Sequence, residues 1–188
     1  MANVTHSSLT GSDLHEPKGV AAASSGEVYI ANGSGSGHWD YYNSYVNGYV
    51  TFDAVGPAET HSVTTSFTVF DPTFTIGDNR DWIGEASPNA RLKFTGDDTS
   101  EVNCQLTMSV QQASGSSKDL EIIFRKNGAA LNGGHAIITC ASGEWRTVTL
   151  TDFGTFSTND YLEVFFKGSA AFTLNIAGAN LTALGIHQ

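Results

Sequence analysis

The sequence predicts an all-β protein, an antiparallel sandwich that follows an extended N-terminal segment. Three observations support this prediction. About ten short segments beyond residue 45 are rich in β-branched and aromatic residues and are separated by turn-forming residues. Several of them alternate apolar and polar residues with a period of two, and no long stretch has the helical period. The chain also has 20 glycines and only two methionines, which favours strands and turns.

The first 45 residues differ in composition from the rest of the chain. They are rich in Ser, Gly, Asn and His, and residues 27–31 form their one short β-type stretch. Residues 32–37 have the composition of a flexible linker. We interpret residues 1–45 as an extended arm that orders when it packs on another surface. Residues 46–188 are long enough for a single domain with its own core.

The clearest predicted strand covers residues 101–110, where apolar residues occupy every second position. An Asn-Gly turn at Asn127 and Gly128 is expected to join two further strands in a hairpin. The other expected strands are 49–52, 63–70, 90–95, 120–125, 136–140, 145–150, 161–167, 172–176 and 179–184. The expected core residues are Val102, Leu106, Met108, Leu120, Ile122, Phe124, Leu162, Val164 and Phe166.

Two of these strands carry apolar residues on both faces. Tyr161 and Phe165 lie opposite the core side of strand 161–167, and Ile123 interrupts the polar side of strand 120–125. Strands of this kind are usually covered on both faces. The cover is either a second subunit or a loop of the same chain. Ile123, Tyr161 and Phe165 are therefore candidates for contacts between subunits.

Composition and motifs argue against most chemical functions. The net charge is −10, from 9 basic and 19 acidic residues, which disfavours binding to phosphate backbones or anionic lipid. No nucleophile elbow, phosphate-binding loop or histidine pair at metal-ligand spacing is present, so we predict no enzyme, cofactor or metal site. Asp78 with Asp81, or Asp97 with Asp98, could hold Ca²⁺, but a turn role is the favoured interpretation.

The remaining features concern the compartment in which the protein is made, the state of its cysteines and the role of an aromatic cluster. No signal peptide or membrane-spanning run is recognised, so synthesis in a cytoplasm without export is expected. Cys104 and Cys140 are expected to be reduced core thiols, with a bridge between them as the alternative. The aromatic cluster that contains Trp39, Tyr41 and Tyr42 has two interpretations. It is buried at the base of the sandwich or in a subunit interface, or its rings stack on sugar rings. We favour burial.

One stretch resembles a known class of proteins. Residues 4–20 contain the run Leu14-His15-Glu16-Pro17-Lys18-Gly19, and the likeness continues through 26–33 to Trp39. This stretch resembles the N-terminal segment of tailed-phage virion proteins, including head-fibre and capsid-decoration types. The resemblance implies that residues 1–45 attach the protein to a capsid. The candidate anchoring residues are Leu9, Leu14, His15, Pro17, Val28, Tyr29 and Ile30.

A second stretch, residues 88–185, resembles a different class of protein domains. It contains Phe124-Arg125-Lys126-Asn127-Gly128 and Thr158-Asn159-Asp160-Tyr161-Leu162-Glu163-Val164. It is similar to jelly-roll domains of the tumour-necrosis-factor and complement type that recur in phage fibres. The resemblance implies a jelly-roll sandwich and a homotrimer, with Ile123, Tyr161 and Phe165 as candidate trimer-interface residues.

Together these observations favour a structural virion protein, made in the host cytoplasm and located on the capsid surface. Its expected partners are its own copies, the major capsid protein or another virion component, and host surface glycans. A tail-fibre or receptor-binding tip with the same fold is one alternative. A carbohydrate-binding module is another, although no signal peptide is recognised.

Overall fold

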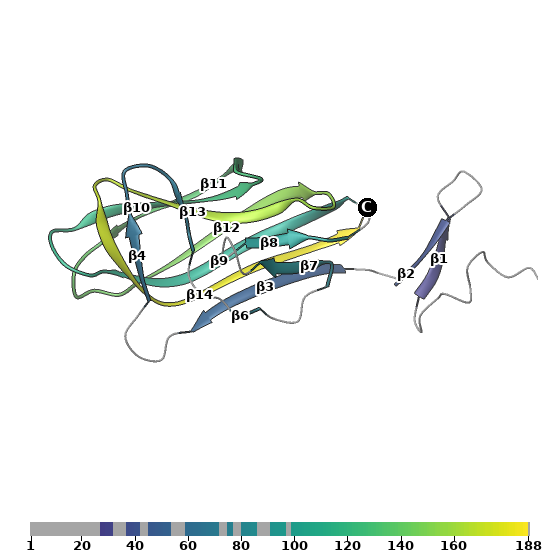
Figure 1. The fold of residues 1–188 in the computed structure, drawn as a ribbon, viewed down its shortest axis with the longest axis horizontal. Helices are drawn as coiled ribbons and strands as arrows, with labels where there is room; N and C mark the ends of the chain where they lie inside the picture. Colours follow the sequence, from purple (N-terminus) through teal and green to yellow (C-terminus); the bar gives the residue numbers. More distant parts are fainter. Residues whose placement is uncertain are drawn as a thin grey trace, which may run out of the picture. The chain divides into compact units, whose positions relative to one another are not determined.

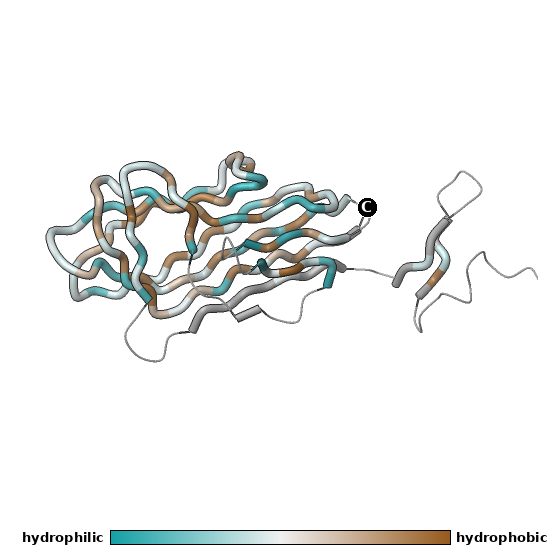
Figure 2. The backbone as a smooth tube through the Cα atoms, viewed as in Figure 1, coloured by the Kyte–Doolittle hydropathy of each residue, from teal (hydrophilic) through white to brown (hydrophobic). Residues whose placement is uncertain are grey.

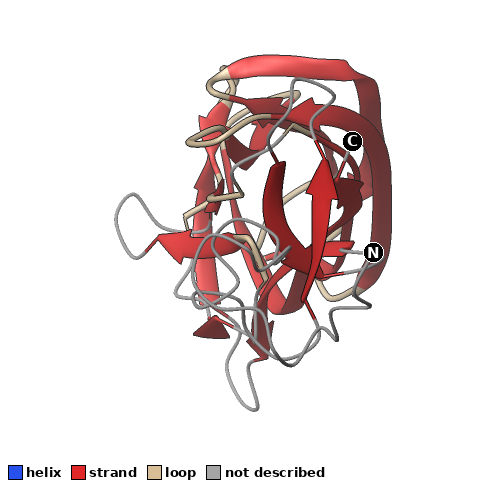
Figure 3. Ribbon diagram, turned by 90° about the vertical axis from the view of Figure 1, so that its right-hand side faces the viewer, coloured by secondary structure: helices blue, strands red, loops and turns tan. Residues whose placement is uncertain are grey.

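A computed structural model shows an all-β protein, which confirms the predicted fold class. All pairings between its named strands are antiparallel, and Figure 3 shows strands and loops but no helix in the described chain. No helix in this part of the chain is long and apolar enough to cross a membrane. The structure describes residues 27–31, 37–41, 45–53, 59–71, 75–76, 80–85, 91–96 and 99–187.

The chain divides into two compact units, Met1–Ser44 and Tyr45–Gln188. In the first unit, strands β1 (Glu27–Ala31) and β2 (Gly37–Tyr41) form an antiparallel hairpin. The β2 strand was not predicted, because the glycine-rich sequence before it was interpreted as a linker. Residues 32–36 of that linker lie outside the described residues.

The second unit is a sandwich of two antiparallel sheets (Figure 1). The first sheet has the strand order β12-β9-β14-β3-β6, and β4 also pairs with β14. Its strands are β3 (Tyr45–Asp53), β4 (Glu59–Val63), β6 (Thr75–Ile76), β9 (Ser100–Gln112), β12 (Arg146–Phe156) and β14 (Phe172–His187).

The second sheet has the order β11-β10-β13-β8-β7, and β5 also pairs with β13. From β9 onward the chain changes sheet at the β9–β10, β11–β12, β12–β13 and β13–β14 connections, which is typical of a jelly-roll sandwich. The strands of this sheet are β5 (Thr68–Val69), β7 (Trp82–Glu85), β8 (Arg91–Phe94), β10 (Lys118–Lys126), β11 (Ala129–Cys140) and β13 (Tyr161–Gly168).

The core lies between the two sheets and confirms the predicted set of buried residues. All nine predicted core side chains are at most 1% exposed. Trp82 makes edge-to-face contacts with Phe94 and Phe156, with ring centroids 5.1 and 5.2 Å apart. Hydrophobic and hydrophilic residues alternate along the strands that enclose this core, and Figure 2 shows this as changes of colour along each strand. Cys104 and Cys140 are buried free thiols, as expected.

The predicted strand 63–70 is wrong in one respect, because the chain bends in its middle. Thr64 Oγ1 donates to the carbonyl of Ser66 and accepts from its N–H, at 2.8 and 3.2 Å. Such local side-chain bonds compete with strand pairing. The chain therefore leaves β4, which pairs with β14, and continues as β5, which pairs with β13 in the other sheet.

Other differences concern strand limits. The predicted strands 172–176 and 179–184 are one strand, β14, in which a bulge between Ile176 and Gly178 inserts an extra residue. Strand β12 extends six residues beyond the predicted end at 150, to Phe156. The short strands β6 and β7 were not predicted.

Candidate interaction surface

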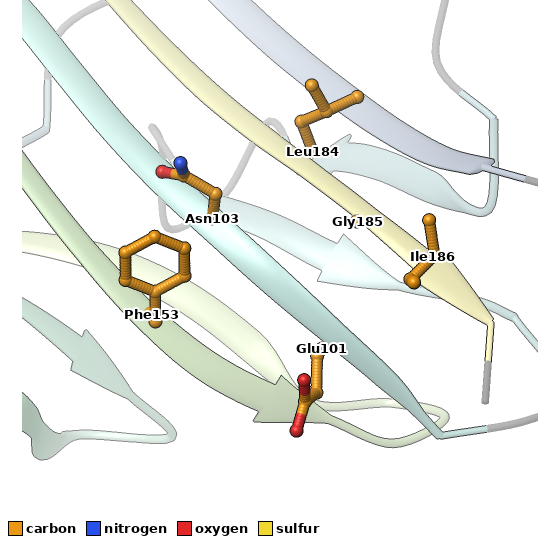
Figure 4. A pocket seen from close by; sticks show the side chains of 6 residues that line it. All are labelled: Glu101, Asn103, Phe153, Leu184, Gly185 and Ile186. Atoms are coloured by element: carbon orange, nitrogen blue, oxygen red, sulfur yellow. The ribbon is translucent and has the colours of Figure 1, made fainter.

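Exposed apolar side chains gather at one end of the first sheet. Phe153, Leu184 and Ile186 are 62%, 56% and 64% exposed. They come from β12 and β14, the two neighbours of β9, and the register places Phe153 and Leu184 on either side of Asn103. Figure 4 shows these side chains projecting from adjacent strands around Asn103. We call Phe153, Leu184 and Ile186 the apolar patch.

Strand alternation explains why the apolar patch faces outward. Val102 and Cys104, the neighbours of Asn103 in β9, are buried in the core. Because successive side chains point to opposite faces of a sheet, Asn103 and its cross-strand partners must lie on the outer face. The apolar patch is therefore outside the core that holds the sandwich together.

A hollow of about 370 Å³ lies within the patch, lined by Glu101, Asn103, Phe153, Leu184, Gly185 and Ile186. Gly185 fits the close approach of β14 to β9, because a Cβ there would collide with the backbone carbonyl of Glu101. The Oδ1 atom of Asn103 is buried without a hydrogen-bond partner among the described residues.

Beyond the patch, the outer face of β9, β12 and β14 is polar but uncharged. Thr107 and Thr149 share a hydrogen bond of 3.4 Å between their hydroxyls, and Thr182 donates to the carbonyl of Gln105 at 3.5 Å. We call the following outward-facing residues the neutral face: Asn103, Gln105, Thr107, Ser109, Thr147, Thr149, Thr151, Phe153, Asn180, Thr182, Leu184 and Ile186.

The outer face of the second sheet is different, because ion pairs cover much of it. Arg91 pairs with Glu85 at 2.8 Å and with Glu163 at 3.4 Å. Lys167 pairs with Glu121 at 2.6 Å. In the described part of the domain, these ion pairs lie on the second sheet, and the neutral face of the first sheet has no charged member.

The three predicted trimer-interface residues lie on this charged face. Ile123 is 9% exposed. The guanidinium of Arg125 lies 4.3 Å from the ring centre of Phe165, and that of Arg91 lies 4.2 Å from the ring centre of Tyr161. Side chains from the neighbouring strands β10 and β8 of the same chain therefore contact both rings, whereas the sequence left open a cover by a loop or by a second subunit. Their role between chains stays a prediction.

Two sequence motifs that carry the jelly-roll resemblance are bonded to each other. Asn127 donates through Nδ2 to Asp160 at 2.6 Å and accepts from the N–H of Tyr161 at 2.8 Å. Lys126 pairs with Asp160 at 2.7 Å. Asn127 and Asn159 both adopt positive φ, at 51° and 73°, a conformation that asparagine tolerates in turns. The two motifs thus connect the β10–β11 turn to the β12–β13 turn.

The contacts between these two turns change the pKa of the Asp160 carboxyl. Burial alone would raise its pKa, but hydrogen bonds from Lys126, the N–H of Ser157 and Asn127 together lower the pKa below its ordinary value. Asp160 is therefore a structural carboxylate that stays ionised. It is not a candidate general acid.

The predicted anchoring and sugar-stacking residues are only partly described. Tyr29 and Trp39 are cross-strand partners in the hairpin, and their rings meet edge to face at 5.5 Å. Val28, on the other face, is 37% exposed. Ile30 and Tyr41 lie in strands, but their side chains are not described. The other predicted residues, Leu9, Leu14, His15, Pro17 and Tyr42, lie outside the described residues.

Two thiols, those of Cys104 and Cys140, are buried in the domain core. Burial raises the pKa of Cys140 to about 11 and raises that of Cys104 further, so both thiols stay protonated at neutral pH. Within the described ranges, no three metal-binding side chains cluster. Of the residues suggested for Ca²⁺, only Asp81 is described, and it lies 3.8 Å from Arg80.

Sequence reasoning missed the apolar patch, although a signal was present. Phe153 interrupts a series of threonines at every second position of β12, from Thr147 to Thr155. Leu184 and Ile186 share a face with Asn180 and Thr182 in the same way. Large apolar residues on an otherwise polar strand face mark each of these side chains as exposed, and the strand order then brings them together.

Comparisons with known proteins found similar folds and no family. No protein-family model matches the sequence, and no curated protein matches it. The PRD1 vertex protein P5 is similar at 14% identity and a TM-score of 0.48, over 76% of this chain and 97% of that one. Murine APRIL aligns at 9% identity and 0.47, over 76% and 99% of the two chains. Eiger TNF from S. frugiperda aligns at 7% and 0.46, over 75% and 92%. None of these similarities assigns the chain to a family.

Proposed function

We propose that this chain is a structural virion protein of a tailed phage. In this proposal the N-terminal unit attaches to the capsid and the jelly-roll forms a trimeric knob outside it. The observation that carries the proposal is the division into a short N-terminal unit and a sandwich with its own complete core. The resemblance of residues 4–20 to virion proteins supports the same assignment of roles.

The hairpin of the N-terminal unit fits an anchoring role. A two-stranded hairpin alone is only marginally stable in water. It pairs Tyr29 with Trp39 and exposes Val28, so it offers apolar surface to a partner, and among the described residues its sheet has only two strands. Strand addition to the edge of a partner's sheet would supply main-chain hydrogen bonds.

A trimer would strengthen such an anchor. Three N-terminal units joined to one knob bind cooperatively, because attachment of the first raises the effective concentration of the others. This gain offsets the entropy that each segment loses when it becomes ordered on the capsid. We therefore propose a homotrimer with the major capsid protein, or another virion component, as its partner.

We also propose that the protein is not an enzyme. The support is the chemistry of the described residues. The two thiols are buried and protonated, and the Glu85, Glu163 and Glu121 carboxylates of the charged face pair with basic side chains. No group among them combines exposure, a raised reactivity and a neighbouring base.

Deletion of residues 1–44 tests the proposed function. The truncated chain is expected to remain folded and trimeric but to bind capsids that lack the protein at least tenfold more weakly than the full chain. The full chain with Tyr29→Ala and Trp39→Ala, which weaken only the hairpin, is expected to give an intermediate loss. If the truncated chain decorates capsids as well as the full chain does, the anchoring role is wrong.

Glycan binding is a second candidate function, favoured by the described aromatic residue Trp39. Aromatic rings stack on the C–H faces of sugars. A glycan array probed with the full chain and with Trp39→Ala tests this candidate. Loss of a specific signal in the variant would support it, and the absence of any signal for the full chain would exclude it.

A further inference from the structure

The chain contains four Asn-Gly pairs, which begin at Asn32, Asn47, Asn127 and Asn132. In this sequence asparagine loses its side-chain amide readily, because glycine leaves the following backbone nitrogen unhindered. We propose that Asn127 is a deamidation site whose reaction the folded protein suppresses through Asp160, and which reacts when the two turns separate. This inference does not depend on the proposed virion role.

The β10–β11 turn explains why a reactive pair stands at this position. Lys126 pairs with Ala129, so Asn127 and Gly128 are the two residues of the hairpin loop. Their φ angles are 51° and 79°, and a type I′ turn requires positive φ at both positions. Asn-Gly is the pair that adopts this conformation best. The turn therefore favours a sequence that is chemically labile.

The reaction needs only groups of the chain and water. The backbone nitrogen of Gly128 attacks the side-chain carbonyl carbon of Asn127 and gives up its proton. A new C–N bond closes a five-membered succinimide ring, and the bond from Cγ to Nδ2 breaks. The Nδ2 group takes up the proton and leaves as ammonia. Water then opens the ring at either carbonyl, and the product is aspartate or isoaspartate.

The side-chain amide of Asn127 is held at both ends in the folded protein. Its Nδ2 donates to Asp160 at 2.6 Å, and its Oδ1 accepts from the N–H of Tyr161 at 2.8 Å. The backbone N–H of Asn127 adds a bond of 3.1 Å to the carbonyl of Tyr161. The amide therefore cannot rotate for the attack without loss of hydrogen bonds to the other turn.

The attacking nitrogen of Gly128 is also held. It donates to Oε2 of Glu163 at 3.1 Å, and Glu163 is 7% exposed and pairs with Arg91. A carboxylate is too weak a base to remove the proton of a backbone amide. The amide anion that attacks would instead lie beside a carboxylate, and like charges repel strongly in a partly buried site. Both parts of the reaction are thus disfavoured while the turns are joined.

The product of deamidation would not restore these contacts. Aspartate has a negatively charged oxygen in place of Nδ2, which now lies 2.6 Å from Oδ1 of Asp160. Two carboxylates at that distance repel each other. Isoaspartate lengthens the backbone, so a two-residue turn no longer fits between the paired strands. Each reaction at Asn127 is therefore a permanent record that the two turns have separated.

The test measures deamidation at each Asn-Gly pair of the full-length protein by peptide mass spectrometry, during incubation in mildly alkaline buffer. In folded wild type we expect Asn127 to react at least about tenfold more slowly than in the same protein unfolded in urea. Asp160→Ala is expected to accelerate the reaction of Asn127 in the folded protein by at least about tenfold. The rates at Asn32, Asn47 and Asn132 are expected to stay those of wild type.

Val110→Ala is the control that separates the contacts of Asp160 from general stability. Val110 is buried at the end of β9 that pairs with Arg146, whereas the β12–β13 turn follows the opposite end, where Ser100 pairs with Phe156. Truncation of a core side chain destabilises the domain without removing a contact between the two turns. We expect Asn127 to react in this variant at the wild-type rate.

Two outcomes would overturn the proposal. The first is an equal rate at Asn127 in folded wild type and in Asp160→Ala. The second is an equal acceleration in Asp160→Ala and Val110→Ala, which would show that general stability protects the site. If Asp160→Ala does not fold, Asp160→Asn replaces it. This variant keeps the size of the side chain and removes its charge, and an acceleration of at least about threefold is expected.

Discussion

At the scale of single residues, His61 has an unusual environment. Its ring, on β4, makes edge-to-face contacts with Phe70 and Phe166, with centroids 5.7 and 5.5 Å apart. The Nε2 atom is buried without a hydrogen-bond partner among the described residues. Burial lowers the pKa of His61, and the nearby Asp71 carboxylate opposes this shift only in part. The folded protein therefore prefers the neutral imidazole.

This preference predicts a pH dependence of stability. Because the pKa is lower in the folded state, the unfolded chain binds a proton first as the pH falls below about 6.5. The stabilisation is complete above that pH and is lost as the pH falls through the folded pKa. We expect the free energy of unfolding in urea to fall more between pH 7.5 and 5.5 for wild type than for His61→Phe. Equal losses in the two proteins would contradict this role of His61.

Gly185 is a second residue with a specific structural requirement. A Cβ at this position would meet the backbone carbonyl of Glu101, which cannot move without disturbing the β9–β14 pairing. We expect Gly185→Ala to reduce the free energy of unfolding by about 1–3 kcal/mol, as overpacking does. Chemical denaturation measures this change. Thr151→Ala, on the exposed side of β12, is the control, and a loss no larger than that of the control would refute the steric argument.

At the scale of elements, Asn127 and Asp160 link two turns that are far apart in sequence. Their mutual hydrogen bond and the Lys126–Asp160 ion pair hold the β10–β11 turn against the start of β13. These contacts join the two motifs at the end where β10 and β13 pair, next to the Lys126–Leu162 register position.

Removal of the Asp160 carboxylate tests this link. We expect Asp160→Ala to lower the free energy of unfolding by about 1–3 kcal/mol, the usual cost of losing hydrogen bonds to a charged group. Glu144→Ala removes an exposed ion pair with Arg146 and is expected to cost less than about 0.5 kcal/mol. Equal effects of the two substitutions in urea denaturation would show that the turns are not linked in this way.

The elements that the sequence predicts best are those with strict alternation. Strand β9 and the core residues of β10 and β13 follow from their period-two pattern, because one face is buried against a single core. The break between β4 and β5 could not be predicted in this way. Both sides of the bend carry β-branched and aromatic residues. The bend itself depends on the Thr64–Ser66 hydrogen bonds, and the change of sheet is visible only in the pairings of β4 with β14 and of β5 with β13.

At the scale of the whole molecule, the candidate interface was harder to predict than the fold. The sequence shows that Phe165 and Tyr161 are apolar residues opposite the core, but not that Arg125 and Arg91 stack on them. Those contacts join residues on different strands and depend on the strand order. The apolar patch likewise depends on β12 and β14 flanking β9, which no local pattern indicates.

A cryo-electron microscopy reconstruction of virions that carry this chain would show which part of it reaches the capsid. We expect three jelly-roll domains around a threefold axis outside the shell. We also expect the N-terminal segments, and not the jelly-rolls, to reach the shell. Density for single separate domains, or for jelly-rolls that bind the shell directly while the N-terminal segments point away from it, would show that the proposed anchor is wrong.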